Sequence, residues 1–537
     1  MSAGQEPAKS SRRFPRPRVE SVLAAGAALV GVIALVSTLT PDLADRARLI
    51  RGVLPPGFTE LARVLALSFG LALLLLSRSL ARGRRRAWAL ALFAVIGVAL
   101  AHLAKGLDFE ESIVSLLLVV ALLRYRSHFD APGDPAARRP VAGTLLAVAA
   151  MVGIGVVLGT RGMPDRVGDL ISACAVLLTL YSLVLWLGPL PEQVSQSLEE
   201  RRRARELVES FGSDSLAFFT LRHDKSFSFS SSGNAFLAYR LVGSSALISG
   251  DPVGKESEFP ELISDFIERA GDNGWRVAVV GAGRERLGLY REKGLARVIK
   301  IGDEAVVQPA LFSLEGRSMR KVRQSVRKVA ERDEITFRIV RAKDADEELR
   351  LKLEQISSAW LAGRRERGFS MAMDDLFAPG GVFALALDTS AEPIAFLHLV
   401  PSPAGGGYSL SSQRRLPGSP GGVSEFLVAS AMVWAREAGV PELSLNFCAF
   451  RSLLHIDEND ERLLRRLLRK ALLRLDVVFQ IERLRAFSHK FRPEWRPRYV
   501  CLERLSDLPA VGLAYLRAES LIATPRPPSR KRPPRSD

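Results

Sequence analysis

The stretch SFSFSSSGNAFLAYRLVGSSALISGD, residues 226–251, contains three short runs rich in apolar and aromatic residues. Ser, Gly and Asn separate the runs, and these residues favour turns between strands. A helix-like segment at 256–271 and the strand-like run WRVAVVG follow. This alternation predicts an α/β fold that begins with antiparallel hairpins.

A similar succession of predicted elements recurs further along the chain. ITFRIVR predicts a strand, residues 345–362 a helix, and VFALALD, PIAFLHLVP and GYSLSSQ a meander of strands. An amphipathic helix at 423–439 and the strand ELSLNFC complete the second series. We therefore predict a charged linker at 192–210 and two α/β units in tandem, at 211–312 and 313–510. The segment 511–537 is basic, and its Pro/Arg-rich composition predicts disorder from residue 523.

The first part of the chain has a different character. Six uncharged or nearly uncharged runs lie before residue 192, at 22–40, 64–77, 87–104, 112–123, 141–160 and 170–191. Crossing a bilayer takes about 20 residues of apolar helix. Buried core helices are the alternative, but short charged loops separate these runs. We predict a domain of about six spans at 21–191, behind a basic cytoplasmic tail at 1–20.

The basic residues between the runs predict the orientation of this domain. If the N-terminus lies inside, the cytoplasmic segments carry 18 Lys and Arg against 6 on the other side. Because positive residues concentrate in cytoplasmic loops, both termini and the α/β units are expected in the cytoplasm. The predicted location is a bacterial cell (inner) membrane, with a multi-pass topology.

Charge and cysteine content limit the kinds of site. Residues 192–537 contain 54 Lys and Arg against 46 Asp and Glu, so an anion site there must be a local patch. The three cysteines, Cys174, Cys448 and Cys501, form no C-x-x-C pair, and the six histidines are scattered. We predict neither a disulfide framework nor a metal site.

One such patch is GRSMRKVRQSVRKV, residues 316–329. Four apolar residues recur at helical spacing and predict one buried stripe: Met319, Val322, Val326 and Val329. Six basic residues fill the other faces: Arg317, Arg320, Lys321, Arg323, Arg327 and Lys328. The helix is either a solvated basic surface or a phosphate-binding face.

Several segments resemble the phosphatidylglycerol lysyltransferase family, also called aminoacyl-phosphatidylglycerol synthases or multiple peptide resistance factors. They are FSLEGRSMRKVRQSVRKV, DKSFSFSSSGNAFLAYRLVGSSALISGDPVG, WLAGRRERGFSMAM and LNFCAFRSLL, and the resemblance covers about 205–505. The membrane half, with AKGLDFEES, resembles that of short actinobacterial members, here without a fused lysyl-tRNA synthetase. The resemblance implies an α-helical transmembrane bundle joined to a cytoplasmic tandem of acetyltransferase-like (GNAT-like) folds.

The resemblance also implies a reaction and its partners. The family transfers an amino acid from aminoacyl-tRNA to a hydroxyl of phosphatidylglycerol at the inner leaflet, which changes the surface charge of the membrane. The expected partners are aminoacyl-tRNA, phosphatidylglycerol and the lipid bilayer, and a homo-oligomer is compatible with the sequence. No cofactor is expected, because the donor ester is already activated.

Site residues are carried over by motif. The implied catalytic residues are Glu366, Ser411 and Arg414. The implied ligands of tRNA or lipid phosphates are Lys225, Arg451, Lys490 and Arg492, together with the six basic residues at 317–328. Asn446 and Trp360 are implied to line the substrate path. Ordinary surface or core positions are the alternative for Lys225, Glu366 and Arg451.

Two departures keep other functions open. The family usually has an aspartate where this chain has Ser411, so the amino acid is lysine or a smaller, neutral one such as alanine. The loss of activity, leaving a lipid-binding or tRNA-binding module, is a second possibility. A CoA-dependent N-acyltransferase is a third, although RRLPGSPGGVS lacks the usual pyrophosphate-loop spacing. No general base is evident, since His398 and His489 qualify only by residue type.

Overall fold

The computed structural model describes residues 19–39, 58–106, 109–131, 150, 194, 196–363, 368–369, 372–449 and 485–521. The chain divides into two compact units. One comprises residues 1–191 with 269–275, and the other comprises residues 192–268 with 276–537.

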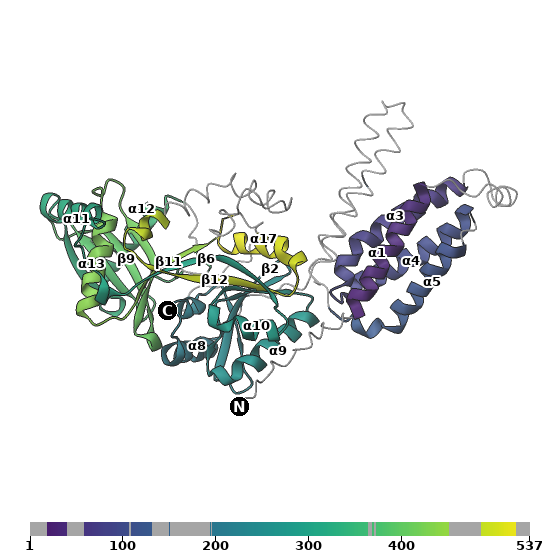
Figure 1. The fold of residues 1–537 in the computed structure, drawn as a ribbon, viewed down its shortest axis with the longest axis horizontal. Coiled ribbons are helices and arrows are strands. Elements are labelled where there is room, and N and C mark those ends of the chain that lie inside the picture. The colour runs from purple at the N-terminus through teal and green to yellow at the C-terminus, as the bar shows by residue number, and fades with distance from the viewer. Residues whose placement is uncertain are drawn as a thin grey trace, which may run out of the picture. The chain divides into compact units, whose positions relative to one another are not determined.

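The described part of the N-terminal unit is helical (Figure 1). Its helices are α1 (Val19–Leu39), α3 (Phe58–Leu80), α4 (Arg85–Gly106) and α5 (Phe109–Arg124). Two segments, Val19–Ser37 and Arg85–Leu103, are long and apolar enough to cross a membrane, and Leu65–Leu80 is a shorter apolar helix. These helices match the first four predicted runs. The runs at 141–160 and 170–191 lie outside the described residues, so a count of six spans stays a prediction.

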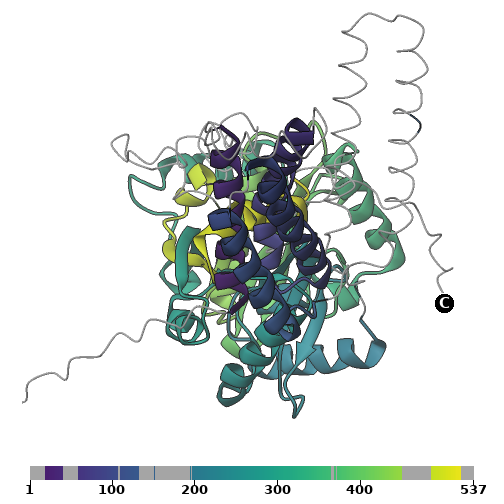
Figure 2. The same ribbon diagram turned by 90° about the vertical axis from the view of Figure 1, so that its right-hand side faces the viewer.

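The four helices pack side by side as a bundle (Figure 2). A Cβ added to Gly31 on α1 would lie 2.7 Å from the carbonyl oxygen of Gly70 on α3, so small residues permit this close approach. Apolar side chains also cover the outside of the bundle, and Leu117 is 66% exposed. An apolar outer surface is what a helical bundle presents to lipid.

The C-terminal unit is built on one twelve-stranded sheet within the described residues. Its strands are β1 (Ser226–Phe229), β2 (Ala235–Val242), β3 (Ser245–Ser249), β4 (Val253–Gly254), β5 (Arg276–Ala282), β6 (Arg297–Val307), β7 (Thr336–Arg341), β8 (Val382–Leu387), β9 (Pro393–Ser402), β10 (Gly407–Arg415), β11 (Leu443–Ala449) and β12 (Glu494–Leu502). The order is β1-β2-β3-β5-β12-β6-β11-β10-β9-β8-β7, and β4 pairs with β2. The runs predicted as strands form ten of these elements, whereas β4 and β12 were not predicted as strands.

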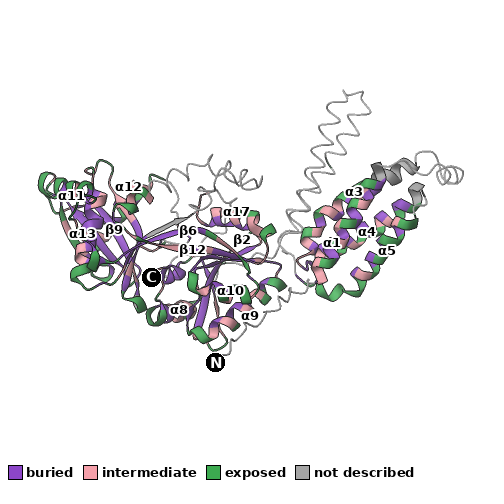
Figure 3. Cartoon of the chain, viewed as in Figure 1, coloured by how far each residue is buried: buried purple, intermediate pink, exposed green. Residues whose placement is uncertain are grey.

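The last strand, β12, lies in the middle of the sheet. It pairs antiparallel with β5 on one side and with β6 on the other. Both neighbours belong to the first predicted unit, whereas β12 belongs to the second. The two units therefore share one continuous sheet, whose strands are largely buried (Figure 3). The boundaries predicted for the units remain predictions.

Helices pack on this sheet. They are α8 (Leu198–Phe211), α9 (Phe259–Asp272), α10 (Leu287–Glu292), α11 (Arg320–Arg327), α12 (Glu347–Leu361), α13 (Val423–Glu437) and α17 (Leu508–Ala518). Helix α17 packs on β2 and β3, α12 on β9 and β10, and α13 on β8 and β9. Helix α11 packs on α13, which places it on the outer side of that layer.

Two parallel strand pairs shape the functional region. Strands β3 and β5 pair along the whole of β3, from Ser245 to Ser249. Strands β10 and β11 pair only at Tyr408–Leu443 and Ser409–Ser444 within the described residues. The first pair ends beside the beginning of the second, and loops from both meet there.

Candidate functional site

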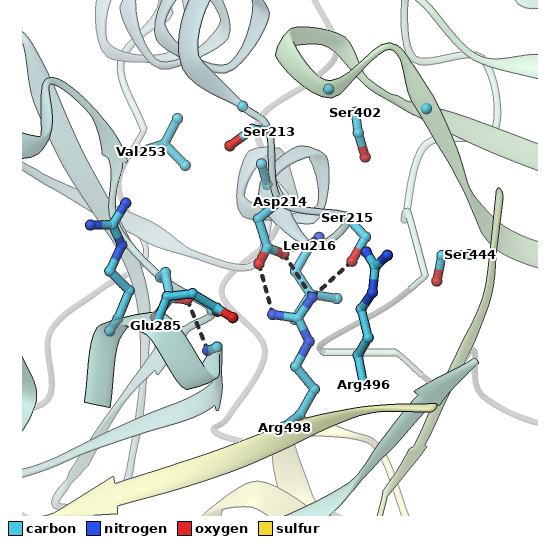
Figure 4. A pocket seen from close by; sticks show the side chains of 18 of the residues that line it. Ser213, Asp214, Ser215, Leu216, Val253, Glu285, Ser402, Ser444, Arg496 and Arg498 are labelled. Atoms are coloured by element: carbon cyan, nitrogen blue, oxygen red, sulfur yellow. Dashed lines mark hydrogen bonds and ion pairs between the residues drawn. The ribbon is translucent and has the colours of Figure 1, made fainter. Parts of the chain in front are cut away.

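A pocket of about 600 Å³ lies where the two strand pairs meet (Figure 4). The loops after β3 and β5, residues 250–254 and 283–286, form one wall. The loop 213–217, the start of β10 and residues 494–498 of β12 form much of the rest, and Ser402, Glu442 and Ser444 also line the pocket. In α/β proteins, the carboxyl ends of parallel strands are the usual position of a ligand site.

Arg498 of β12 holds the pocket floor together. Its guanidinium donates to Asp214 Oδ2 at 2.7 Å and to Glu304 Oε2 at 2.6 Å. It also donates to Ser215 Oγ at 2.9 Å, and Ser444 Oγ donates to Glu304 Oε1 at 2.5 Å. Burial alone would raise the pKa of Asp214, but the charge and hydrogen bonds of Arg498 lower it overall. The network joins β12, β6, β11 and the loop after α8.

Asp251 forms the other acidic side of the pocket. Its Oδ1 accepts a hydrogen bond from the Tyr290 hydroxyl at 2.7 Å, and its Oδ2 accepts one from the Gly283 N–H at 2.9 Å. Burial, and then the nearby charge of Asp214, raise the pKa of Asp251 to about 6. The position of this carboxylate is therefore fixed, but its charge is not fully compensated.

Lys225 lies in the interior, not on a phosphate-accessible surface. The side chain is fully buried, and its Nζ donates to Phe219 O and Ser249 Oγ, both at 2.6 Å. The ring of Phe369 covers it, with 4.9 Å between Nζ and the ring centroid. Burial, and then the charge of Arg222, lower the pKa of Lys225 to about 7. The resemblance had implied a phosphate ligand here, and that role stays a prediction; in the described residues Lys225 contacts Phe219, Ser249 and Phe369.

We expect a Lys225→Met variant to lose a specific pH dependence of stability. In the unfolded chain the pKa of the Lys225 ammonium is near 10.5. Between pH 7 and 10.5 this side chain therefore binds more protons in the unfolded chain than in the folded chain. The wild type therefore gains stability as the pH rises in that window, by at most about 1.4 kcal/mol per pH unit from one proton. The difference between the thermal unfolding midpoints at pH 7 and pH 8.5 should be smaller in this variant than in the wild type. The exposed control Lys255→Met should keep the wild-type difference. Equal pH dependence in all three proteins would contradict the burial of a titrating ammonium.

Two of the implied catalytic residues, Ser411 and Arg414, lie on β10. Ser411 is the extra residue of a β-bulge, since Leu410 pairs with Leu399 and Ser412 with His398. Bulges often redirect side chains near functional sites. Ser411 Oγ accepts a hydrogen bond from the Met373 N–H at 2.9 Å. The loop of Met373 also carries Phe369, so Ser411 and Lys225 are joined through one loop.

The structure describes some of the other predicted site residues but not all of them. Arg414 is half-buried on β10, and the guanidinium of Arg415 lies 5.8 Å from the centroid of Trp360. Asn446 is on β11, but the position of its side chain is outside the description. Glu366 and Arg451 lie outside the described residues.

Neither histidine gains support as a base. His398 is fully buried and stacks on Phe383 at 5.1 Å between ring centroids. Burial, and then the charge of Arg414, lower its pKa to about 3, so this imidazole is neutral and a poor proton acceptor at pH 7. His489 is exposed and lies next to the basic residue Lys490.

The basic helix forms as predicted, with one apolar side inward. Met319, Val322 and Val329 are buried, and Val326 packs against the same core. Arg323 is half-buried and donates to the Leu314 carbonyl at 2.5 Å, so it faces the protein's own backbone. The remaining five are exposed: Arg317, Arg320, Lys321, Arg327 and Lys328.

A second predicted motif joins this helix. Arg492 donates a hydrogen bond to Ser318 Oγ, just before α11. Lys490 forms an ion pair with Glu425 of α13 at 2.7 Å, and both Lys490 and Arg492 are exposed. We call the seven exposed cations, Arg317, Arg320, Lys321, Arg327, Lys328, Lys490 and Arg492, the basic face. Segments about 165 residues apart thus contribute to one positive surface.

Sequence reasoning missed the residues that build the pocket floor. The resemblance had implied Lys490 and Arg492 in this part of the chain, but not Arg498. The strands that carry Arg498 and Glu304 contain several other charged residues, so nothing in their sequence marked these two as the buried pair.

Comparisons with known proteins agree with this architecture. A family model described as "Phosphatidylglycerol lysyltransferase, C-terminal" matches residues 205–502. The lysylphosphatidylglycerol biosynthesis bifunctional protein LysX of Mycobacterium marinum is 38% identical over 336 residues, which are 61% of this chain and 30% of that protein. LysX of Mycobacterium tuberculosis (strain H37Rv) is 36% identical over 335 residues, or 61% and 28%. This chain therefore spans about 30% of the length of these curated relatives.

Two solved structures share the fold of the C-terminal unit. L-PGS from Bacillus licheniformis has a TM-score of 0.53 and 25% identity, covering 60% of this chain and 96% of that one. The C-terminal domain (DUF2156) of a putative lysylphosphatidylglycerol synthetase from Agrobacterium fabrum has a TM-score of 0.51 and 28% identity, covering 60% and 98%. With a family match over more than half of its length, the chain belongs to the phosphatidylglycerol lysyltransferase family.

Proposed function

We propose that this chain transfers an amino acid from aminoacyl-tRNA to a hydroxyl of phosphatidylglycerol at the cytoplasmic leaflet. Its relatives are named for lysylphosphatidylglycerol synthesis. The observation that carries the tRNA part of the proposal is the basic face, where residues 317–328 and 490–492 present seven exposed cations. A polyanion is the natural partner of such a surface.

The proposed reaction is an ester exchange. A glycerol hydroxyl of the lipid attacks the ester carbonyl of the aminoacyl group, and a new carbon–oxygen bond forms. The bond to the 3′-terminal ribose oxygen of the tRNA breaks, and that oxygen gains the proton that the glycerol hydroxyl loses. Because one ester replaces another, most of the rate enhancement comes from holding two large anionic substrates in reach of each other.

The described residues suggest roles in that positioning. Arg414 on β10 supplies positive charge near the Ser411 bulge, where we place the transfer. The catalytic role of Glu366 rests on the family resemblance alone. Lys225 acts as a positioning residue, because it anchors Phe369 in the loop whose Met373 N–H is bonded to Ser411. The same proposal includes two GNAT-like folds in tandem and a multi-pass membrane domain.

We expect Ser411→Asp to change the choice of amino acid. A carboxylate at the buried bulge can still accept the Met373 N–H and would attract a cationic side chain. The preference for a lysyl over an alanyl donor should rise by about tenfold, the effect of roughly 1.4 kcal/mol. Competition between the two charged tRNAs in one reaction measures it. An unchanged product ratio would remove Ser411 from amino acid selection.

Lipid extracts test the function itself. Cells that express the chain should contain a lipid with the mass of phosphatidylglycerol plus one amino acid, absent from the vector control. The mass also names the amino acid. Unchanged lipids, with the protein verified in the membrane, would reject the transferase and favour a lipid-binding or tRNA-binding module.

A further inference from the structure

Helix α17 is apolar on two opposite sides. Its inner side packs into the core over β2 and β3 and includes Val511, Tyr515 and Ala518, which are spaced as one helix face. A helix that only covers a sheet normally presents polar or charged residues to water on its other side. The sequence of α17, LPAVGLAYLRA, instead contains a single charged residue, Arg517.

The outer side of α17 is an exposed apolar stripe. Four apolar residues follow one another at intervals of four, four and three positions, which places them on one side of the helix and of the short turn before it. We call them the outer stripe: Leu505, Pro509, Leu513 and Leu516. Leu505 is 54% exposed and Leu513 is 41% exposed. A single exposed leucine is ordinary, but a continuous apolar stripe indicates an interaction surface.

The charges around the outer stripe favour an anionic partner. The acidic residues directly before and after α17 are both engaged within the protein. Asp507 pairs with Arg276 at 3.2 Å, and Glu519 accepts a hydrogen bond at 2.8 Å from the Phe369 N–H. The sequence 522–537, which lies outside the described residues, contains five Lys and Arg against one Asp. An apolar helix face beside a cluster of cations is typical of segments that lie on an anionic membrane surface.

The outer stripe is connected to the region where we place the transfer. Glu519, which follows α17, is bonded to the N–H of Phe369, and the loop of Phe369 also supplies the Met373 N–H that Ser411 accepts. Helix α17 covers β2 and β3 near one end of the sheet, whereas α11 of the basic face packs on α13 over β8 and β9 near the other end (Figure 1). The apolar and the basic surface can therefore be occupied at the same time.

We propose that the outer stripe docks on the anionic leaflet of a lipid bilayer, with its leucine side chains among the acyl chains. The positive charge of the sequence 522–537 adds attraction to the lipid phosphates. A polyanion without an apolar phase, such as tRNA, would leave the leucines in water, so a bilayer fits both properties of the surface. The inference goes beyond the proposed transfer, because docking needs neither aminoacyl-tRNA nor turnover.

Spin labels on the full-length protein in vesicles test the proposal. The label is attached to Leu513→Cys or, as a control, to Leu351→Cys, a leucine of α12 that is 51% exposed. Both variants also carry Cys174→Ala, Cys448→Ala and Cys501→Ala, so that only one thiol reacts. In vesicles of phosphatidylglycerol and phosphatidylcholine, the label at position 513 should be more accessible to oxygen, which concentrates in lipid, than to a water-soluble nickel chelate. The label at position 351 should show the reverse.

The vesicle composition and the two reagents separate the possible occupants of the surface. In vesicles of phosphatidylcholine alone, the label at position 513 should lose most of its preference for oxygen, because the anionic charge is absent. Equal preference in both vesicles would overturn the choice of an anionic leaflet. High accessibility to nickel in the mixed vesicles would overturn docking itself. Low accessibility to both reagents would also overturn it, because another protein segment would then cover the outer stripe.

A double variant tests the same surface without labels. Leu505→Glu combined with Leu513→Glu changes two exposed side chains, so the thermal unfolding midpoint should stay the same. The apparent KM for phosphatidylglycerol in vesicles should rise by about tenfold or more, because two leucines no longer enter the lipid. Leu351→Glu should leave this KM unchanged. An unchanged KM in the double variant would overturn the proposal. This second measurement rests on the proposed function, and if the wild type transfers no amino acid, the spin labels alone decide whether the stripe docks.

Discussion

Replacing Arg498 with methionine is expected to destabilise the C-terminal unit by about 3–5 kcal/mol, the usual result of breaking a buried ion pair from one side. Arg498 is 7% exposed and Glu304 is fully buried, so the variant leaves the Glu304 carboxylate without its cation. Asp214 loses the partner that keeps its pKa low. The thermal unfolding midpoint of the purified full chain in detergent measures the effect.

A matched arginine provides the control for this experiment. Arg504 is half-exposed and pairs with Glu503 at 3.5 Å near the same strand. Exposed pairs contribute about 0–1 kcal/mol, so Arg504→Met should leave the midpoint nearly unchanged. If the two variants unfold at similar temperatures, then Arg498 does not hold β12, β6 and the loop after α8 together.

Reversing charge on the basic face is expected to cause the largest loss of activity. A variant with Arg320, Lys321, Arg327 and Lys328 all changed to Glu should bind aminoacyl-tRNA about 100-fold or more weakly, because each of these cations is proposed to neutralise a tRNA phosphate. The slope of log affinity against log salt should fall by about 3, at roughly 0.7–0.9 per neutralised phosphate. All four side chains are exposed, so the fold should be retained.

A second quadruple variant controls for net charge. Lys255, Arg291, Arg297 and Lys343 are exposed elsewhere on the C-terminal unit, and their reversal changes the total charge equally. Filter binding of labelled aminoacyl-tRNA at several salt concentrations compares the two variants. If both lose the same affinity, then the attraction comes from overall charge, and the basic face is not the docking surface.

The local elements of this fold could be read from sequence because their patterns are local. The spacing of Met319, Val322 and Val329 predicted the buried side of the basic helix, and all three are buried. The turn residues between the runs at 226–251 predicted hairpins that form β1, β2 and β3. Such patterns depend only on which side of an element faces the core.

The long-range arrangement could not be read in this way. Nothing local in EWRPRYVCL indicates that it pairs between β5 and β6, about 200 residues earlier. The phosphate role of Lys225 was implied by the family motif. Its burial could not be read from the motif, because its partners, Phe219 O, Ser249 Oγ and Phe369, are supplied by tertiary packing. The pocket has the same origin, because loops from many separate segments form it.

The most direct test of the proposed function is transfer in a defined mixture. Purified full-length protein is incubated with phosphatidylglycerol vesicles and tRNA that carries a labelled amino acid, beside a sample with the same labelled amino acid free in solution. We predict that label moves from the charged tRNA into a lipid with the mass of aminoacyl-phosphatidylglycerol, and that the free amino acid gives none. Label that stays on the tRNA or appears only as free amino acid, with folded protein present, would contradict the proposed transfer.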